Sequence, residues 1–98
     1  MNIKKEQTPG KLLIAIEGRL DTVSAPEFEK EIKTITPDIG ELELDFAALE
    51  YISSAGLRLL LACQKMMNKQ GSMIIRNANE SIREVLEITG FINILKLV

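Results

Sequence analysis

Hydrophobic and polar residues alternate in several short segments of the chain, a pattern that is typical of β-strands. The clearest segment is residues 41–46, where Leu42, Leu44 and Phe46 alternate with acidic residues and predict a strand with one face in water. The turn residues 8–11 predict an antiparallel hairpin between the first two strands. The other predicted strands cover residues 2–7, 12–17, 72–76 and 92–97.

Apolar residues at helical spacing predict three helices. The first begins at a predicted capping box of Ser24 and Glu27 and ends by Thr36. A strand, a helix and a strand in succession indicate parallel pairs with right-handed crossovers, so the chain is predicted to form one mixed α/β domain with about five strands. The other two helices are predicted from the segment 53–56 to about Asn68, and from Asn77, as a cap, to Thr89.

The second predicted helix has a broad apolar face and an exception to it. At about 100° per residue, Leu57 and Leu61 lie one turn apart on the otherwise polar side, beside Arg58. Two interpretations follow: these leucines pack under the next helix, near residues 79–88, or they form an exposed patch that binds a partner. The broad apolar face consists of Leu59, Leu60, Ala62, Cys63, Met66 and Met67.

Two serines stand at the start of this helix. Ser53 or Ser54 can be the N-cap, which is a structural role. Alternatively, a phosphate on one of these hydroxyls would bring about −1.5 to −2 charges to a helix N-terminus, which tolerates anions. A docked partner would have to bury that charge, so phosphorylation is expected to end binding while the fold persists.

Composition excludes several kinds of chemistry. The 98 residues include 12 Lys and Arg, 14 Asp and Glu, one Cys and no His. Without His there is no Ser-His-Asp triad and no Cys/His metal site, and Lys65 and Lys69 lie too far along the helix to activate Ser54. We therefore expect no enzyme, no cofactor and no bound metal. The net charge of −2 argues against direct binding of nucleic acid.

The sequence shows no signal for export or membrane insertion. Residues 1–6 lack the apolar stretch of a signal peptide, and the longest apolar run, residues 59–63, is far too short to cross a membrane. Cys63 lies in that run and is expected to be a small buried side chain in a reducing compartment. We therefore expect a cytoplasmic protein that does not contact a membrane.

The segment 45–57, which ends in Tyr-Ile-Ser-Ser-Ala-Gly-Leu, resembles the anti-sigma factor antagonists of bacteria, whose fold is the STAS domain. The resemblance covers essentially the whole chain and also rests on residues 18–21, Gly71 and residues 89–91. It implies a STAS-like domain over residues 1–98, with about three helices packed mainly on one face of the sheet. In that family, an unphosphorylated antagonist binds an anti-sigma factor that is itself a serine kinase and so frees a sigma factor; a serine phosphatase resets the switch.

The resemblance also implies roles for single residues. Ser54 matches the serine that is phosphorylated in the family, and Asp21 matches an acidic residue held near it. Many members have Asp directly before the acceptor, where this chain has Ser53, so Ser53 is an alternative acceptor. Asp21 can equally be a turn former. The expected partner-binding residues are Asp21, Ser53, Ser54, Gly56, Leu57, Arg58 and Leu61.

Similar STAS domains also belong to other assemblies. An alternative function is therefore a regulatory or scaffold subunit of a lipid-transport complex with an ATPase and a permease, or of a sensory complex. A gene neighbourhood with a small kinase and a sigma factor would favour the switch. In either function we expect a monomer or a weak dimer.

Overall fold

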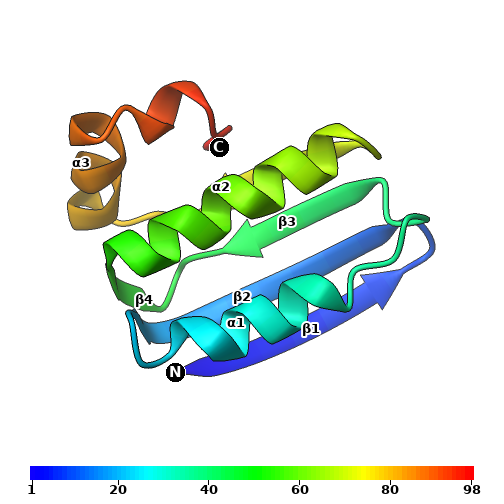
Figure 1. The fold of residues 1–98 in the computed structure, drawn as a ribbon, viewed down its shortest axis with the longest axis horizontal. Coiled ribbons are helices and arrows are strands. Elements are labelled where there is room, and N and C mark those ends of the chain that lie inside the picture. Colours follow the sequence, from blue (N-terminus) through cyan, green and yellow to red (C-terminus); the bar gives the residue numbers. More distant parts are fainter.

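A computed structural model describes residues 1–98 as a twisted sheet with helices against it (Figure 1). The chain begins with a β-hairpin and then alternates helices and strands. The elements are β1 (Asn2–Thr8), β2 (Lys11–Leu20), α1 (Ala25–Lys33), β3 (Glu41–Asp45), β4 (Leu49–Ile52), α2 (Ser54–Asn68), β5 (Ser72–Arg76), α3 (Glu80–Ile88) and the short 3-10 helix η1 (Phe91–Asn93).

The strands form a mixed sheet in the order β1-β2-β3-β5, and β4 pairs with the end of β2. β1 and β2 run antiparallel, whereas the other pairs are parallel. α1 and α2 lie across the same face of the sheet, and α3 lies near the end at which β4 is found (Figure 1). The predicted mixed α/β fold, with about five strands and helices mainly on one face, is confirmed.

Buried and more exposed side chains alternate along the strands, so one face of the sheet forms the core and the other is less covered. Leu12, Leu42 and Met73 stand in register across β2, β3 and β5, and all three are buried. Phe28 of α1 and Leu60 of α2 belong to the same core. Burial of each side chain of this size stabilises the folded state by about 1.5–3 kcal/mol. The contacts of Phe28 and Leu60 with this core therefore hold α1 and α2 on the sheet. The next buried layer consists of Ile14, Leu44 and Ile75.

The predicted strand over residues 92–97 is wrong. After Gly90, whose φ of 80° lets the chain turn sharply, η1 forms, and Leu95 returns its N–H to the carbonyl of Phe91. Only Leu97 pairs with the sheet, through an isolated bridge to Ile75. A short apolar run fits a short helical turn as well as a strand, so periodicity could not decide this segment. The fifth strand is β4 instead.

The predicted capping box of α1 and the predicted cap of α3 at Asn77 are wrong as well. Ser24 is the N-cap residue of α1, but its side chain makes no capping bond; α1 ends at Lys33, in agreement with the predicted end by Thr36. The cap of α3 is Asn79, whose Oδ1 accepts the N–H of Ile82 at 2.9 Å. Asn77 has a left-handed backbone and donates its side-chain amide to Asp45. Several residues near each start could cap, and the tertiary contacts select among them.

Candidate functional site

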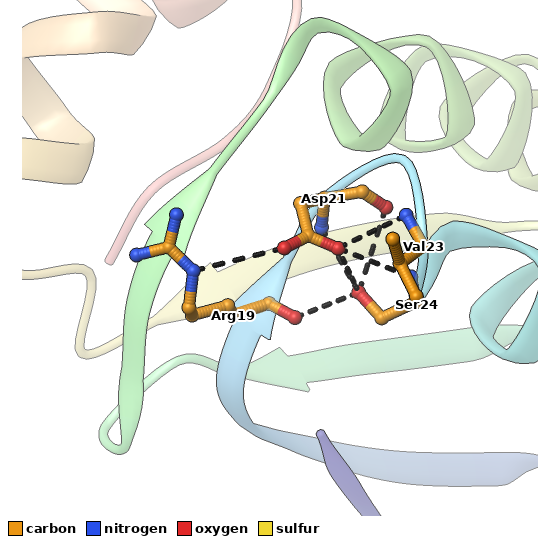
Figure 2. A network of polar contacts seen from close by, with 4 residues as sticks. All are labelled: Arg19, Asp21, Val23 and Ser24. Atoms are coloured by element: carbon orange, nitrogen blue, oxygen red, sulfur yellow. Dashed lines mark hydrogen bonds and ion pairs between the residues drawn. The ribbon is translucent and has the colours of Figure 1, made fainter.

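The loop between β2 and α1 is organised around the carboxylate of Asp21 (Figure 2). Its Oδ1 accepts the backbone N–H groups of Val23 and Ser24, each at 3.1 Å. The Ser24 hydroxyl accepts the Asp21 N–H at 2.9 Å and donates to the carbonyl oxygen of Arg19 at 2.7 Å. This is the bonding pattern of an Asx turn, so the interpretation of Asp21 as a turn former accounts for its contacts.

The same bonds favour the charged form of Asp21. The N–H of Ser24 contributes most, the Ser24 hydroxyl and the N–H of Val23 add to it, and the attraction of Arg19 is smaller. Together they lower the pKa of Asp21 below its ordinary value of 3.8, although partial desolvation opposes them. The carboxylate is therefore ionised at neutral pH.

Arg19 links this loop to β4. Its Nε lies 3.6 Å from Oδ2 of Asp21, and its guanidinium carbon lies 4.2 Å from the centroid of the Tyr51 ring. Arg19 and Tyr51 are register partners in the β2–β4 pair, which places both side chains at the same position along the sheet. Because both side chains are exposed, they present a cation stacked on an aromatic ring to solvent.

The two serines at the start of α2 differ in exposure. Ser53 is the N-cap residue: its N–H donates to Leu20 and its carbonyl accepts the N–H of Leu57, both at 2.9 Å. The Oγ of Ser53 is buried, makes no capping bond and has no hydrogen-bond partner. Ser54, the first residue of α2, is exposed. The backbone thus turns one hydroxyl inward and leaves the next residue accessible.

Gly56 and Leu57 belong to the core. A Cβ at Gly56 would come within 2.8 Å of the side chains of both Ile52 and Leu20, so only glycine lets α2 approach the strand ends this closely. Leu57 is 7% exposed and shares the core with Ile82 of α3. The exposed patch predicted at Leu57 is therefore wrong, and the alternative that it packs toward α3 fits the structure.

The buried face of α2 is not the predicted apolar face: it is rotated about the helix axis toward the side that carries Leu57. Gln64, predicted on the polar side, is 7% exposed and donates its amide to Asn68 at 2.8 Å, whereas Ala62 is exposed. Leu61 is half-buried, and Arg58 is exposed, as its position on the polar side predicts. Helical spacing identifies apolar stripes, but the elements packed beside a helix decide which stripe is buried.

A groove of about 320 Å³ joins the loop to the start of α2. On one side it is lined by Thr22 and the first turns of α1, and on the other by Ala55 and Arg58 of α2. Val23, next to Thr22, is 90% exposed. The structure thus brings the segment after β2 and the segment after β4 to one surface. The remaining lining residues are Ala25, Pro26, Glu29 and Leu59.

Sequence reasoning missed three residues of this surface. Val23 is an isolated apolar residue in a turn, Tyr51 lies in a short strand with no clear alternating pattern, and Leu59 was predicted to be core. Leu59 does pack partly against the core while it also lines the groove. No periodic signal marks an exposed apolar residue, so only the tertiary structure identifies Val23 and Tyr51.

Other kinds of site find little support. No group of three or more His, Cys, Asp or Glu side chains is arranged to hold a metal ion. Cys63 is buried, and desolvation raises the pKa of its thiol to about 12, so it stays protonated and unreactive at neutral pH. None of the helices has both the length and the apolar character needed to cross a membrane.

Comparisons with known proteins point to one family. The family model of the STAS domain matches residues 2–98. Over 97 residues the chain is 34% identical to BtrV of Bordetella bronchiseptica, which is named as an anti-sigma factor antagonist; the match covers 96% of this chain and 83% of that protein. The chain is 26% identical over 98 residues to the anti-sigma-B factor antagonist of Bacillus subtilis, covering 99% of this chain and 90% of the other.

The fold is also similar to that of SpoIIAA, an anti-sigma factor antagonist and cell fate determinant of Bacillus. Its unphosphorylated form superposes with a TM-score of 0.77 at 19% identity, covering 99% of this chain and 87% of that one. Its phosphorylated form gives a TM-score of 0.77 at 20% identity, covering 99% of this chain and 91% of that one.

Proposed function

The chain belongs to the STAS domain family, among the anti-sigma factor antagonists, and from this premise we propose that it is a binding switch controlled by phosphorylation of Ser54. In its unphosphorylated form it binds an anti-sigma factor that is a serine kinase, and this binding releases a sigma factor. The proposed contact region, called the switch surface below, comprises Arg19, the loop Asp21–Ser24, Tyr51, Ser54 and Arg58.

The observation that carries this proposal is the difference between the two adjacent serines. Ser54 is exposed on the surface that also bears the groove, whereas the Oγ of Ser53 is buried. A kinase must bring its phosphoryl donor into line with the attacking hydroxyl, which requires an accessible oxygen. The geometry therefore favours Ser54 over Ser53 as the acceptor, although Ser53 stands where many family members have Asp.

The start of α2 can carry a phosphate without losing its fold. The Ser53 side chain accepts no hydrogen bond from the first N–H groups of the helix, so these donors and the helix dipole remain available to an anion on Ser54. SpoIIAA, which shares this fold, has been solved in both phosphorylated and unphosphorylated forms. A partner that covers the switch surface would instead have to bury the phosphate charge, which weakens binding strongly.

The chemistry of the switch is assigned to the partners. The chain has no histidine, and its single thiol is buried and protonated, so neither a histidine nor a cysteine side chain can serve as a base or nucleophile for Ser54. In this proposal the anti-sigma factor supplies the kinase active site and a serine phosphatase removes the phosphate. The chain contributes the acceptor hydroxyl and the docking surface.

The test uses the chain with its cognate anti-sigma factor kinase. With ATP, we expect one phosphate on the chain, located at Ser54 by mass spectrometry; Ser54→Ala should remain unmodified, and the matched control Ser53→Ala should be modified normally. Ser54→Asp should lower the affinity at least a hundredfold, measured by calorimetry, while Ser54→Ala binds as the wild type. Phosphate at Ser53, or equal affinity of Ser54→Asp and wild type, would contradict the proposal.

A pull-down from the native organism separates the proposal from the alternative. Capture of a kinase-type anti-sigma factor by the Ser54→Ala variant, and not by Ser54→Asp, is the expected result. Capture of an ATPase and a permease by both variants would instead support a transport subunit.

A further inference from the structure

We propose that Val23 is the apolar anchor of the switch surface and inserts into an apolar pocket of the anti-sigma factor, with Arg58 meeting a carboxylate at the rim of that pocket. This inference rests on the function proposed above and adds to it the residues that select the partner. Asp21 and Ser24 act in it as positioning residues, because they hold Val23 in place.

Val23 has the most exposed large apolar side chain of the molecule, at 90%. Single exposed apolar residues are common on protein surfaces, but this one stands at the junction of two features that point to a partner. It lies next to Thr22, which lines the groove, and the opposite wall of that groove includes Ala55, adjacent to Ser54. A partner that covers Ser54 closely enough to be repelled by its phosphate therefore also reaches Val23.

The backbone that carries Val23 is fixed in advance. Its own N–H and that of Ser24 bond to Oδ1 of Asp21, and the Ser24 hydroxyl ties the turn to Arg19 (Figure 2). The valine side chain itself has few rotamers. Little conformational freedom is therefore lost when Val23 becomes buried in a complex, and such preorganised residues are favourable anchors.

Charge supports the choice of partner surface. Arg19 is already paired with Asp21, whereas Arg58 is exposed on the groove wall and forms no salt bridge. A carboxylate on the partner would complement this free guanidinium, and Arg binds carboxylates in a defined bidentate geometry. An apolar pocket with an acidic rim is the surface that fits this arrangement.

The test measures the affinity of variants for the cognate anti-sigma factor. Val23→Ala should weaken binding about tenfold, since two of the three carbons of the valine side chain are removed. Val23→Thr, which keeps the shape but replaces one methyl group with a hydroxyl, should weaken it similarly. The matched control is Val98→Ala: Val98 is 53% exposed and lies at the outer edge of β5, across the sheet from this loop. It should bind as the wild type, and none of these variants should change the melting temperature.

The positioning role is tested by a double-mutant cycle. Asp21→Ala should weaken binding by itself but add little in the Val23→Ala background, since a misplaced anchor and an absent one have the same consequence. Arg58→Gln should weaken binding and reduce its dependence on salt. Additive effects of Asp21→Ala and Val23→Ala would overturn the positioning role.

The outcomes distinguish this inference from the switch itself. If Val23→Ala and Val23→Thr bind as the wild type while Ser54→Asp does not bind, the anchor is wrong and the switch stands. If the anti-sigma factor binds wild type and Ser54→Asp equally, or binds neither, the switch is wrong and the anchor falls with it.

Discussion

The helices α2 and α3 begin in different ways, although each follows a strand and a short polar segment. At α3, Asn79 uses its side chain for the helix: Oδ1 accepts the N–H of Ile82, and the amide donates to the carbonyl of Leu49. At α2, Ser53 makes no such bond, and its hydroxyl is buried without a partner. The first N–H groups of α2, like those of α1, therefore have no side-chain acceptor, and at α2 they remain available to an anion on Ser54.

Both ends are anchored from beneath. In the first turn of α2, Gly56 and Leu57 are buried against the ends of the strands, and in the first turn of α3, Ile82 is buried; Ser54 and Glu80 are exposed on the outer sides. The start of α2 is thus rigid on its inner side and free on its outer side. This combination lets a charge be added to Ser54 while the helix stays in place.

The largest expected effect tests the inner side of α2. Leu57→Ala should lower the free energy of unfolding by about 2–5 kcal/mol, because it leaves a cavity in the core. Urea denaturation measures this loss. Leu61→Ala, one turn along and half-buried, is the matched control and should cost less. Equal costs at the two positions would contradict the burial that distinguishes them.

Removal of the α3 cap should have the next largest effect. Asn79→Ala loses the capping bond to Ile82 and the bond to Leu49, so we expect the free energy of unfolding to fall by about 1–2 kcal/mol. Asn79→Ser retains a side chain that can cap and should recover part of the loss. Thermal unfolding followed by circular dichroism distinguishes the variants; an unchanged midpoint for Asn79→Ala would show that the cap does not matter.

Phosphorylation should act in the opposite direction at α2. A phosphate on Ser54 adds negative charge at the helix N-terminus and should raise the free energy of unfolding by about 0.3–1 kcal/mol at low salt. The gain should shrink at high salt because exposed charges are screened. A phosphorylated chain that unfolds more easily than the unmodified one would contradict the view that this end tolerates anions.

Ser53→Ala should show the smallest effect on stability and the sharpest contrast with Asn79→Ala. Its hydroxyl is buried without a partner, and removal of an unsatisfied polar group is neutral or stabilising. We expect a change within about 0.5 kcal/mol of wild type in denaturant unfolding. A loss of stability as large as that of Asn79→Ala would mean that the Ser53 hydroxyl makes a capping hydrogen bond to α2.

The loop at Asp21 should respond to pH in a defined direction. Because the pKa of Asp21 is lowered in the folded chain, its contribution to stability is present above the ordinary value of 3.8 and is lost as the pH falls through the lowered pKa. The amide resonances of Val23 and Ser24 in NMR spectra should therefore shift together in that acidic range. In Asp21→Asn this transition should be absent; its persistence would assign the titration to another group.

Several elements of the fold were predictable because they depend on local geometry. The alternation of Leu42, Leu44 and Phe46 with acidic residues predicted β3, and the serines before an apolar run predicted the start of α2. The terminal segment 92–97, by contrast, was predicted as a strand, but after Gly90 the chain turns into η1, and of its apolar residues only Leu95 is buried. Local sequence patterns predict secondary structure, but they do not show which distant segments pack against each element.

The sequence by itself determined that this protein is a mixed α/β domain with two serines at the start of a helix, and its motif placed it with the anti-sigma factor antagonists. Only the tertiary structure decided that Ser54 is exposed while the hydroxyl of Ser53 is buried, that Leu57 is core, and that Val23 projects into solvent. The physical reason is that secondary structure follows from the repeat of apolar residues along the chain. Exposure depends instead on which distant segments pack against each side chain, and here β2 and its following loop meet α2 across more than thirty intervening residues.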